Sequence, residues 1–361
     1  MKSQATLTKN ELLGYISPIS SNFSSYGVAP VEIPSLFSDK LTSWIDNGYS
    51  AEMHYMSKHG TKRYRPKELE PWVTTILIFT LPYLHKKEEL SKIINDSNRG
   101  YISRYALGRD YHKVFKKELN EITNSLTKTI GEFKSRIFVD SAPVMERALA
   151  LTSGIGWFGK NSMLISKDSG SFNFIGVIYT DIDCTELNSS TPKSHCGNCF
   201  KCGESCPTGA IVAPYTVDSN KCISYLTIEN KGVIPLELRP LIGNRIYGCD
   251  DCQICCPWNR FAKHTNLSDF KPRNNLDTIS LLELFEWTEE EFLKKMEGSP
   301  IRRIGYDSWQ RNIAVALGNS KEKGDKLLDV ISALKRQSKN SSTLATEHIN
   351  WALENLRKTL I

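Results

Sequence analysis

The sequence predicts an α/β domain, then a cysteine-rich segment that folds around metal, and then an all-helical domain. Helical and strand-like patterns alternate over the first half of the chain, up to about residue 185. Nine of the ten cysteines lie between Cys196 and Cys256. Apolar residues recur at three- and four-residue spacing through the last 90 or so residues. We therefore expect three domains, spanning residues 1–185, 186–265 and 270–361.

In the first domain, residues 36–49 predict an amphipathic helix whose apolar face carries Leu36, Phe37, Leu41, Trp44 and Ile45. Residues 75–81 and 136–139 are rich in β-branched and aromatic side chains and predict strands. Helical periodicity covers residues 101–130. Residues 163–166 and 172–180 predict a hairpin across the turn KDSGS. The strand order is left open.

The second domain has little periodicity and buries too little apolar surface to fold without metal. In the third, five segments have helical spacing: 279–285, 289–296, 309–317, 326–336 and 346–356. RNIAVALGN and HINWALENL are typical of second helices of HEAT-type pairs, although a plain helical bundle explains them equally well.

The first cysteine motif is Cys196-x2-Cys199-x2-Cys202-x3-Cys206-Pro207. This is the bacterial ferredoxin spacing, in which three thiolates bind one [4Fe–4S] cluster and the fourth reaches a neighbouring cluster. Zinc sites commonly use two separate Cys-x2-Cys pairs, which explains this run poorly.

A second motif, Cys249-x2-Cys252-x2-Cys255-Cys256-Pro257, repeats the Cys-x3-Cys-Pro ending. Two such motifs predict a ferredoxin-like domain with two [4Fe–4S] clusters that exchange their fourth ligands. Cys196, Cys199, Cys202 and Cys256 then bind the first cluster. Cys206, Cys249 and Cys252 bind the second, for whose last iron Cys222 and Cys255 compete; the spacing favours Cys255.

Two features of the first domain bear on chemistry. The run Gly154-x-Gly156-x-x-Gly159 matches the dinucleotide-binding pattern, but a helix precedes it and a strand follows it, the reverse of that motif. We expect instead a turn that admits a flat cofactor or close packing. Asp140 ends a predicted strand just before Ser141-Ala142-Pro143, so it is either a helix N-cap or an acid at the ligand-binding end of the sheet.

The charge of the chain is unevenly distributed. Residues 58–67 carry five basic residues and no acidic one, and residues 99–117 carry six basic residues against Asp110. Their combined charge of +10 exceeds the chain total of +6. A polyanion, nucleic acid first among them, is the expected partner, with an ordinary solvated helix face as the alternative. The longest apolar run is too short to span a bilayer and we find no export signal, so we expect a cytoplasmic protein without a membrane partner.

Together the motifs resemble one family, the epoxyqueuosine reductases. The resemblance runs from about residue 63 to 260, through six ordered motifs and weakly into the C-terminal helices. The motifs are SRYALGRDYHKV (103–114), FVDSAPVMERALA (138–150), GIGWFGKNSMLI (154–165), the first cysteine run, CISYLTIE (222–229) and GCDDCQICCPWN (248–259).

The resemblance implies a cobalamin cofactor beside the two clusters, and a tRNA substrate that carries epoxyqueuosine at its wobble position. Electrons from an external donor pass through the clusters to cobalt, and the epoxide becomes an alkene, the last step of queuosine synthesis. Asp140 falls on the proposed proton donor, which would need a pKa raised by burial beside the corrin. A monomer is expected.

Further site residues are implied in the same way. Asp-x-His-x-x-Gly, a known cobalt-ligating pattern, begins at Asp110 and His112 but has Phe115 in place of glycine, so a base-off corrin without a histidine ligand is expected. The family favours Cys222 over Cys255 as the fourth ligand of the second cluster. It implies a tRNA contact at Glu229. The implied corrin contacts are Arg63, Ser103, Asp140, Leu164, Ile175, Ser224, Thr227, Cys249 and Asp250.

Two other functions remain alternatives. A corrinoid reductive dehalogenase has the same set of cofactors but no reason for a basic patch. An iron–sulfur electron carrier or nucleic-acid-binding protein would have the clusters and no corrin.

Overall fold

The computed structural model describes residues 6–86, 89–187 and 192–358. Its centre is a four-stranded sheet in the order β2 (Ser25–Ala29), β3 (Thr75–Pro82), β8 (Asn173–Thr180) and β5 (Ser135–Phe138), with every neighbouring pair antiparallel. Side chains alternate across β3, since Leu77 and Phe79 enter one hydrophobic core and Ile76 and Ile78 the other. The sheet therefore has a buried core on each face.

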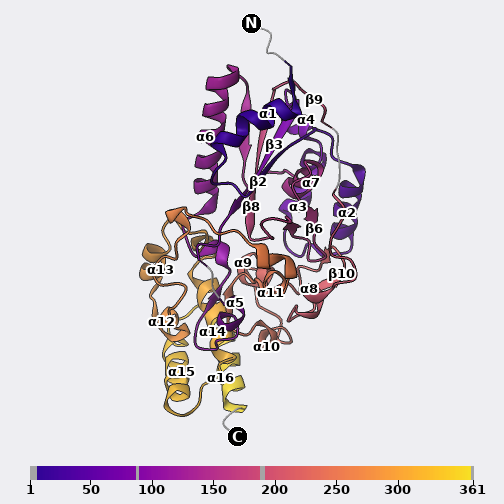
Figure 1. Cartoon of the computed structure of the whole chain (residues 1–361). Coiled ribbons are helices and arrows are strands. Elements are labelled where there is room, and N and C mark those ends of the chain that lie inside the picture. The colour runs from indigo at the N-terminus through magenta and orange to yellow at the C-terminus, as the bar shows by residue number, and fades with distance from the viewer. Residues whose placement is uncertain (1–5, 87–88, 188–191, 359–361) are drawn as a thin grey trace.

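Helices cover both faces of this sheet (Figure 1). α1 (Lys9–Ile16) and α6 (Tyr111–Ile130) pack on one face, and α7 (Glu146–Thr152) packs on the other. α2 (Ser35–Asp46) lies farther out, and of its predicted apolar face Phe37 is buried while Leu36 is 56 % exposed. The α/β expectation for this part of the chain is confirmed.

Two local predictions in this region are wrong. Residues 163–166 and 172–180 do not pair as the two strands of a hairpin: Ser166 and Gly170 form an antiparallel bridge across the predicted turn, but β7 (Leu164–Ile165) pairs with β6 (Trp157–Phe158) and β8 lies between β3 and β5. An eight-residue, mostly buried run suits a central strand better than one arm of a hairpin. The predicted helix over 101–130 begins only at Tyr111, since Asp110 caps it by accepting from the His112 amide.

The residues before that helix connect the first region to the cysteine-rich one. β4 (Tyr101–Ile102) pairs in parallel with β12 (Arg245–Tyr247). Around β12 lie short helices and strands: α8 (Lys201–Glu204), β10 (Ile211–Ala213), β11 (Thr216–Val217), α9 (Ile223–Ile228), α10 (Arg239–Ile242) and α11 (Asp251–Ile254). Such short elements fit a segment that bends around bound groups.

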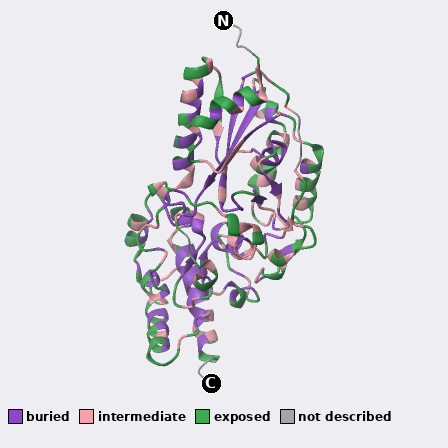
Figure 2. Ribbon diagram, viewed as in Figure 1, coloured by how far each residue is buried: buried purple, intermediate pink, exposed green. Residues whose placement is uncertain are grey.

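All five predicted C-terminal helices are present: α12 (Leu281–Glu286), α13 (Glu289–Lys295), α14 (Tyr306–Gly318), α15 (Gly324–Gln337) and α16 (Thr343–Lys358). α14 is buried over most of its length and packs against α12 and α16 (Figure 2). Their core also takes in Ile102 and Ile246, so it is continuous with the β4–β12 pair. The HEAT-type pairing and the domain boundaries stay predictions.

α14 also fixes the cysteine-rich region in place. The buried guanidinium of Arg311 donates hydrogen bonds to the carbonyls of Leu226, Asn230 and Gly232 at 2.6–2.9 Å. The Asn312 amide donates to the carbonyls of Thr227 and Ile246. These bonds hold α9, whose N-cap residue is Cys222.

The remaining elements are short: β1 (Leu7–Thr8), α3 (Tyr55–Lys58), α4 (Pro66–Leu69), α5 (Leu90–Ile93) and β9 (Cys184–Thr185). None of the helices in the described ranges is long and apolar enough to cross a membrane.

Candidate active site and cysteine centres

The four cysteines predicted for the first cluster line one cavity of about 240 Å³: Cys196, Cys199, Cys202 and Cys256. Cys202 lies on α8, Cys256 follows α11, and Cys196 and Cys199 belong to the loop before α8. Four thiols facing one cavity from two distant segments are the donor set that a [4Fe–4S] cluster requires.

The second group consists of Cys206, Cys222, Cys249 and Cys252. Burial raises the pKa of the Cys252 thiol, and the neighbouring Cys222, Asp250, Cys255 and Cys206 raise it further, in that order. Burial likewise raises the pKa of Cys222, with a contribution from Cys206. The Ala210 amide donates to Cys206 Sγ at 3.3 Å, a contact that stabilises a thiolate. Cys222 and Cys249 pack against the small core around Ile223 and Ile242.

Cys255, the competitor of Cys222, neighbours cysteines of both groups, since its Sγ also lies 3.6 Å from the Cys252 carbonyl oxygen. Burial raises the pKa of the Cys202 thiol to about 11, and Cys255 is the neighbour that contributes most. The pKa of Cys255 itself, raised by burial, also responds to Cys199. Cys222 is the cysteine that raises the pKa of Cys252 most, ahead of Cys255; the choice between Cys222 and Cys255 as the fourth ligand stays a prediction.

Across residues 6–86, 89–187 and 192–358, no three His, Cys, Asp or Glu side chains converge closely enough to hold a single metal ion. A [4Fe–4S] cluster makes a different demand, since each of four thiolates binds its own iron at a corner of the cluster.

Asp140 lies in the loop between β5 and α7, in a left-handed conformation with φ of 59°. Its interpretation as an N-cap is wrong, because α7 begins at Glu146 and Met145 occupies the cap position. The Asp140 carboxylate instead accepts a hydrogen bond from the Tyr111 hydroxyl, and its Oδ2 lies 3.5 Å from His112 Nε2. A strained, non-glycine loop residue with such contacts is typical of a functional site.

The electrostatics of Asp140 differ from the expectation. Desolvation would raise the pKa of Asp140, but hydrogen bonds from His112 and Tyr111 outweigh it and hold the pKa below its usual value. Asp140 is therefore a carboxylate, and the expected raised pKa is not found, because these hydrogen bonds and the charges of His112 and Arg303 stabilise its ionised form.

His112 is held between two carboxylates. Its Nδ1 lies 2.8 Å from Asp110 Oδ1, and its ring stacks on Tyr111. Desolvation opposes protonation, but the hydrogen bonds with Asp110 and Asp140 raise the pKa of His112 to about 9. A cavity of about 470 Å³, lined by His112, Lys116 and Ser141 among others, lies beside it. His112 is therefore a protonated donor with access to solvent.

The structure adds a cation from the helical region, which the sequence did not reveal. Arg303 Nη2 lies 2.5 Å from Glu229 Oε1, and its charge helps to hold the pKa of Asp140 below its usual value. Glu229, the implied tRNA contact, is thus already ion-paired. No motif around Arg303 could have indicated this role, because the pairing depends on how the helices pack.

Arg63 and Glu146 are two half-buried charged residues, and Glu146 lies close enough to Asp140 for the two charges to interact. Arg63 Nη2 donates to the Tyr55 carbonyl at 2.9 Å, whereas within the described residues Arg63 Nε and Glu146 Oε1 are buried without a hydrogen-bond partner. Burial, with a smaller contribution from Asp140, raises the pKa of Glu146 to about 8. Glu146 belongs to the motif FVDSAPVMERALA, but its chemistry was not predicted.

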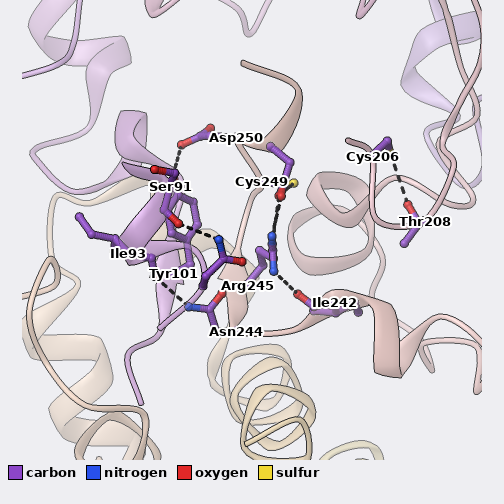
Figure 3. Close-up of polar contacts among 12 residues, drawn as sticks. Ser91, Ile93, Tyr101, Cys206, Thr208, Ile242, Asn244, Arg245, Cys249 and Asp250 are labelled. Atoms are coloured by element: carbon purple, nitrogen blue, oxygen red, sulfur yellow. Dashed lines mark hydrogen bonds and ion pairs between the residues drawn. The ribbon is translucent and has the colours of Figure 1, made fainter. Parts of the chain in front are cut away.

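Asp250 is the centre of a buried network. Its carboxylate accepts from Tyr101 Oη at 2.8 Å, Ser103 Oγ at 2.6 Å and the Arg104 amide at 2.9 Å. Figure 3 shows Asp250 near Tyr101, and Cys249 near Arg245. The network lies directly against the cysteine centre, since Asp250 follows Cys249.

The remaining implied corrin contacts have varied surroundings. Thr227 is fully buried, with its hydroxyl donating to the Ile223 carbonyl and accepting from the Gly248 amide. Leu164 is buried on β7, while Ile175 on β8 and Ser224 on α9 are half-buried.

The basic stretches are only partly available to a polyanion. Lys113, Lys116 and Lys117 extend from α6, and all three are exposed. Arg104, in contrast, is buried over the Tyr101 ring. Two tyrosines of this stretch pack against other aromatic rings of the protein, so they are not available to stack on bases. Tyr105 contacts Tyr111, and Tyr111 stacks on Phe174.

Two groups of cysteines, one of them lining a single cavity, are the donor set of an iron–sulfur oxidoreductase. Residues 195–259 match a family described as a 4Fe-4S double cluster binding domain. Residues 63–141 match the family described as epoxyqueuosine reductase QueG, DUF1730. The chain belongs to the epoxyqueuosine reductase family, as its motifs suggested.

Curated relatives match nearly end to end. The epoxyqueuosine reductase of Pseudomonas aeruginosa is 46 % identical, with 92 % of this chain and 90 % of the relative covered. That of Escherichia coli is 46 % identical over 92 % of this chain and 85 % of its own length.

Solved structures agree. The epoxyqueuosine reductase from Streptococcus thermophilus matches with a TM-score of 0.82, 27 % identity and coverage of 97 % of this chain and 90 % of that one. A second epoxyqueuosine reductase, solved with an epoxyqueuosine-modified tRNA-Tyr stem loop, matches with a TM-score of 0.79, 25 % identity and 97 % and 98 % coverage.

Proposed function

We propose that this protein reduces the epoxide of epoxyqueuosine at the wobble position of tRNA to the alkene of queuosine, in the cytoplasm. The reaction takes up two electrons and two protons: both carbon–oxygen bonds of the epoxide are broken, and its oxygen leaves as water. The observation that carries the proposal is the convergence of four cysteines on one cavity and of further cysteines around Cys252, in a chain of this family whose Asp140 pairs with His112.

Electrons enter one at a time from an external donor through two [4Fe–4S] clusters. Cys196, Cys199, Cys202 and Cys256 hold the first cluster, and Cys206, Cys222, Cys249 and Cys252 hold the second. Cys255 is a spare thiol beside the first.

The site suits a base-off cobalamin without a histidine ligand. Arg63 Nε and Glu146 Oε1 are buried and lack partners in the described part of the chain, so they suit the carboxamides at the rim of a corrin, which both accept and donate hydrogen bonds. Leu164 and Ile175 supply an apolar wall. Ser103, Ser224, Thr227, Cys249 and Asp250 complete the contact surface. When bound, cobalamin supplies a strongly reducing cobalt for attack on the epoxide.

Side chains of this protein deliver a proton to the departing epoxide oxygen. Asp140 donates a proton from Oδ2 to the departing oxygen. Because hydrogen bonds keep Asp140 ionised, that proton must first reach it, and the protonated imidazole of His112, whose Nε2 lies 3.5 Å away, supplies it. Tyr111 orients the carboxylate.

The exposed lysines of α6 and of residues 58–67 bind phosphates of the anticodon stem loop, and Glu229 contacts the tRNA through its pair with Arg303. The protein acts as a monomer.

The test is an absorption spectrum and iron analysis of anaerobically purified protein supplied with cobalamin. About eight irons per chain and a corrin band are expected. Iron without any corrin binding would contradict the cobalamin assignment and favour an electron carrier. Irons and corrin without loss of the epoxide from epoxyqueuosine tRNA would favour a dehalogenase-like reductase instead.

A further inference from the structure

The two cysteine sets differ in their access to solvent. Cys199 of the first set is exposed, and its cavity opens to the surface. In the second set, Cys222 and Cys249 are packed against the core around Ile242. An electron from outside therefore reaches the first set directly.

The rim of the first cavity is basic. Lys160, Lys201 and Arg260 line it together with the four cysteines, and its lining includes no acidic residue. Lys193 and Lys263, which are close to the cavity residues in the sequence, are also exposed. Glu204 is an acidic residue close to Lys201 in the sequence. Lys160 Nζ donates to the Gly197 carbonyl at 2.7 Å, which places this cation over the loop that carries Cys196 and Cys199.

Aromatic side chains lie within this ring of cations. Phe261 is 43 % exposed, and the Arg260 guanidinium lies 4.5 Å from the centre of its ring. Trp258 lines the cavity and packs edge-on against Trp157. A small apolar centre with a charged border is the composition of transient electron-transfer interfaces.

We propose that this basic rim is the docking surface for an acidic protein that carries single electrons. The proposal rests on the proposed function and adds the class of its electron donor. Each encounter oxidises the carrier by one electron and reduces the first cluster by one, so two encounters supply the two electrons for one epoxide. Opposite charges speed such encounters and make them sensitive to salt.

A tRNA is the other polyanion that a basic rim could attract. α6 lies at the upper left of Figure 1, whereas α8, which carries Lys201, lies to the right of the centre. The rim is thus separate from α6, and its cations line a cavity with the four cysteines of the first set.

The experiment compares the wild type with the double variant Lys201→Glu, Arg260→Glu. A matched control, Lys326→Glu with Lys339→Glu, reverses two exposed lysines of the helical region. Anaerobic stopped-flow absorption measures cluster reduction by a reduced acidic plant-type [2Fe–2S] ferredoxin, and separately by reduced methyl viologen, a small cation that needs no docking. Iron content shows that the clusters are assembled.

At low salt the rim variant should lose about tenfold or more of its rate with ferredoxin, while its rate with methyl viologen does not fall and the control matches the wild type. An equal ferredoxin rate in rim variant and wild type would overturn the proposal, as would a wild type that methyl viologen reduces and ferredoxin does not. Loss of tRNA binding with an intact ferredoxin rate would assign the rim to tRNA.

If the charge reversals prevent cluster assembly, Lys201→Gln with Arg260→Gln serves instead, with a smaller loss in the same direction. Failure of the proposed function gives a different result: clusters reduced by methyl viologen in the presence of cobalamin would leave epoxyqueuosine tRNA unchanged.

Discussion

His112 Nε2 lies 3.5 Å from Asp140 Oδ2, while the opposite nitrogen of the same ring lies 2.8 Å from Asp110. The pair has opposite pKa displacements, since the pKa of Asp140 is lowered and that of His112 is raised to about 9. A proton is therefore stored on the histidine, next to the carboxylate that has to deliver it.

His112→Asn should lower the single-turnover rate at pH 7 by about tenfold to a hundredfold, the range for loss of a proton-transfer partner. In the wild type, the rate should hold up to about pH 9 and fall above it, because His112 then loses its proton. The rate of the His112→Asn variant should not show this fall above pH 9. His264→Asn, at an exposed histidine, is the control. An unchanged profile in the His112 variant would remove the histidine from proton delivery.

The same raised pKa has a consequence for folding. A group whose pKa rises on folding stabilises the native state below its unfolded pKa, and this stability is lost as pH rises through the folded value. For His112 the loss falls between about pH 6.5 and 9, and amounts to roughly 1 kcal/mol after solvent screening. Chemical denaturation at pH 6 and pH 9.5 measures it, as the difference between wild type and His112→Asn.

The cysteine assignment predicts different iron contents for two neighbouring substitutions. Cys222→Ala should lose iron from one cluster, because Cys222 neighbours Cys206 and Cys252. Cys255→Ala should retain about eight irons. Iron analysis with electron paramagnetic resonance of the reduced proteins distinguishes them, and the opposite pattern would restore the assignment from spacing.

Arg245 and Asp251 predict opposite shifts of one cluster's reduction potential. They form a two-bond ion pair at 2.5 and 3.0 Å, and Asp251 Oδ2 lies 2.9 Å from Cys249 Sγ. Arg245→Leu removes positive charge and should make the second cluster harder to reduce. Asp251→Asn should make it easier, and the first cluster should change little in both. Shifts of the same sign would mean that the pair acts on structure rather than on charge.

Salt tests the basic face of α6. If Lys113, Lys116 and Lys117 contact phosphates, tRNA affinity should fall steeply between 50 and 200 mM salt. Lys116→Gln with Lys117→Gln should flatten the slope of log affinity against log salt by about one or two. An unchanged slope would exclude these side chains from the interface.

The sequence was most informative where chemistry depends on local spacing. The Cys-x2-Cys-x2-Cys-x3-Cys-Pro run constrains three sulfurs by itself, so the first set could be predicted without knowledge of the fold. The choice between Cys222 and Cys255 could not, because Cys222 lies 27 residues before Cys249, and α14 brings it close through Arg311 and Asn312.

The site around Asp140 likewise could be predicted only in part from the sequence. Asp140 was found as the polar end of a strand, but its partners come from elsewhere: His112 from α6 and Arg303 from the helical region. Helical periodicity explained residues 111–130 and concealed that 101–102 form a strand, since the pairing with β12 is a long-range contact. The pKa of Asp140 was expected to rise, and hydrogen bonds that no sequence pattern reveals lower it instead.

The most direct test of the central claim is mass spectrometry of the modified nucleoside after a single anaerobic turnover with cobalamin, a strong reductant and epoxyqueuosine tRNA. The account predicts loss of one oxygen atom to give queuosine with the wild type. It predicts no conversion with Asp140→Ala, although that variant still binds corrin and about eight irons. Unchanged epoxyqueuosine in the fully loaded wild type would contradict the account, and full conversion by Asp140→Ala would return that residue to a structural role.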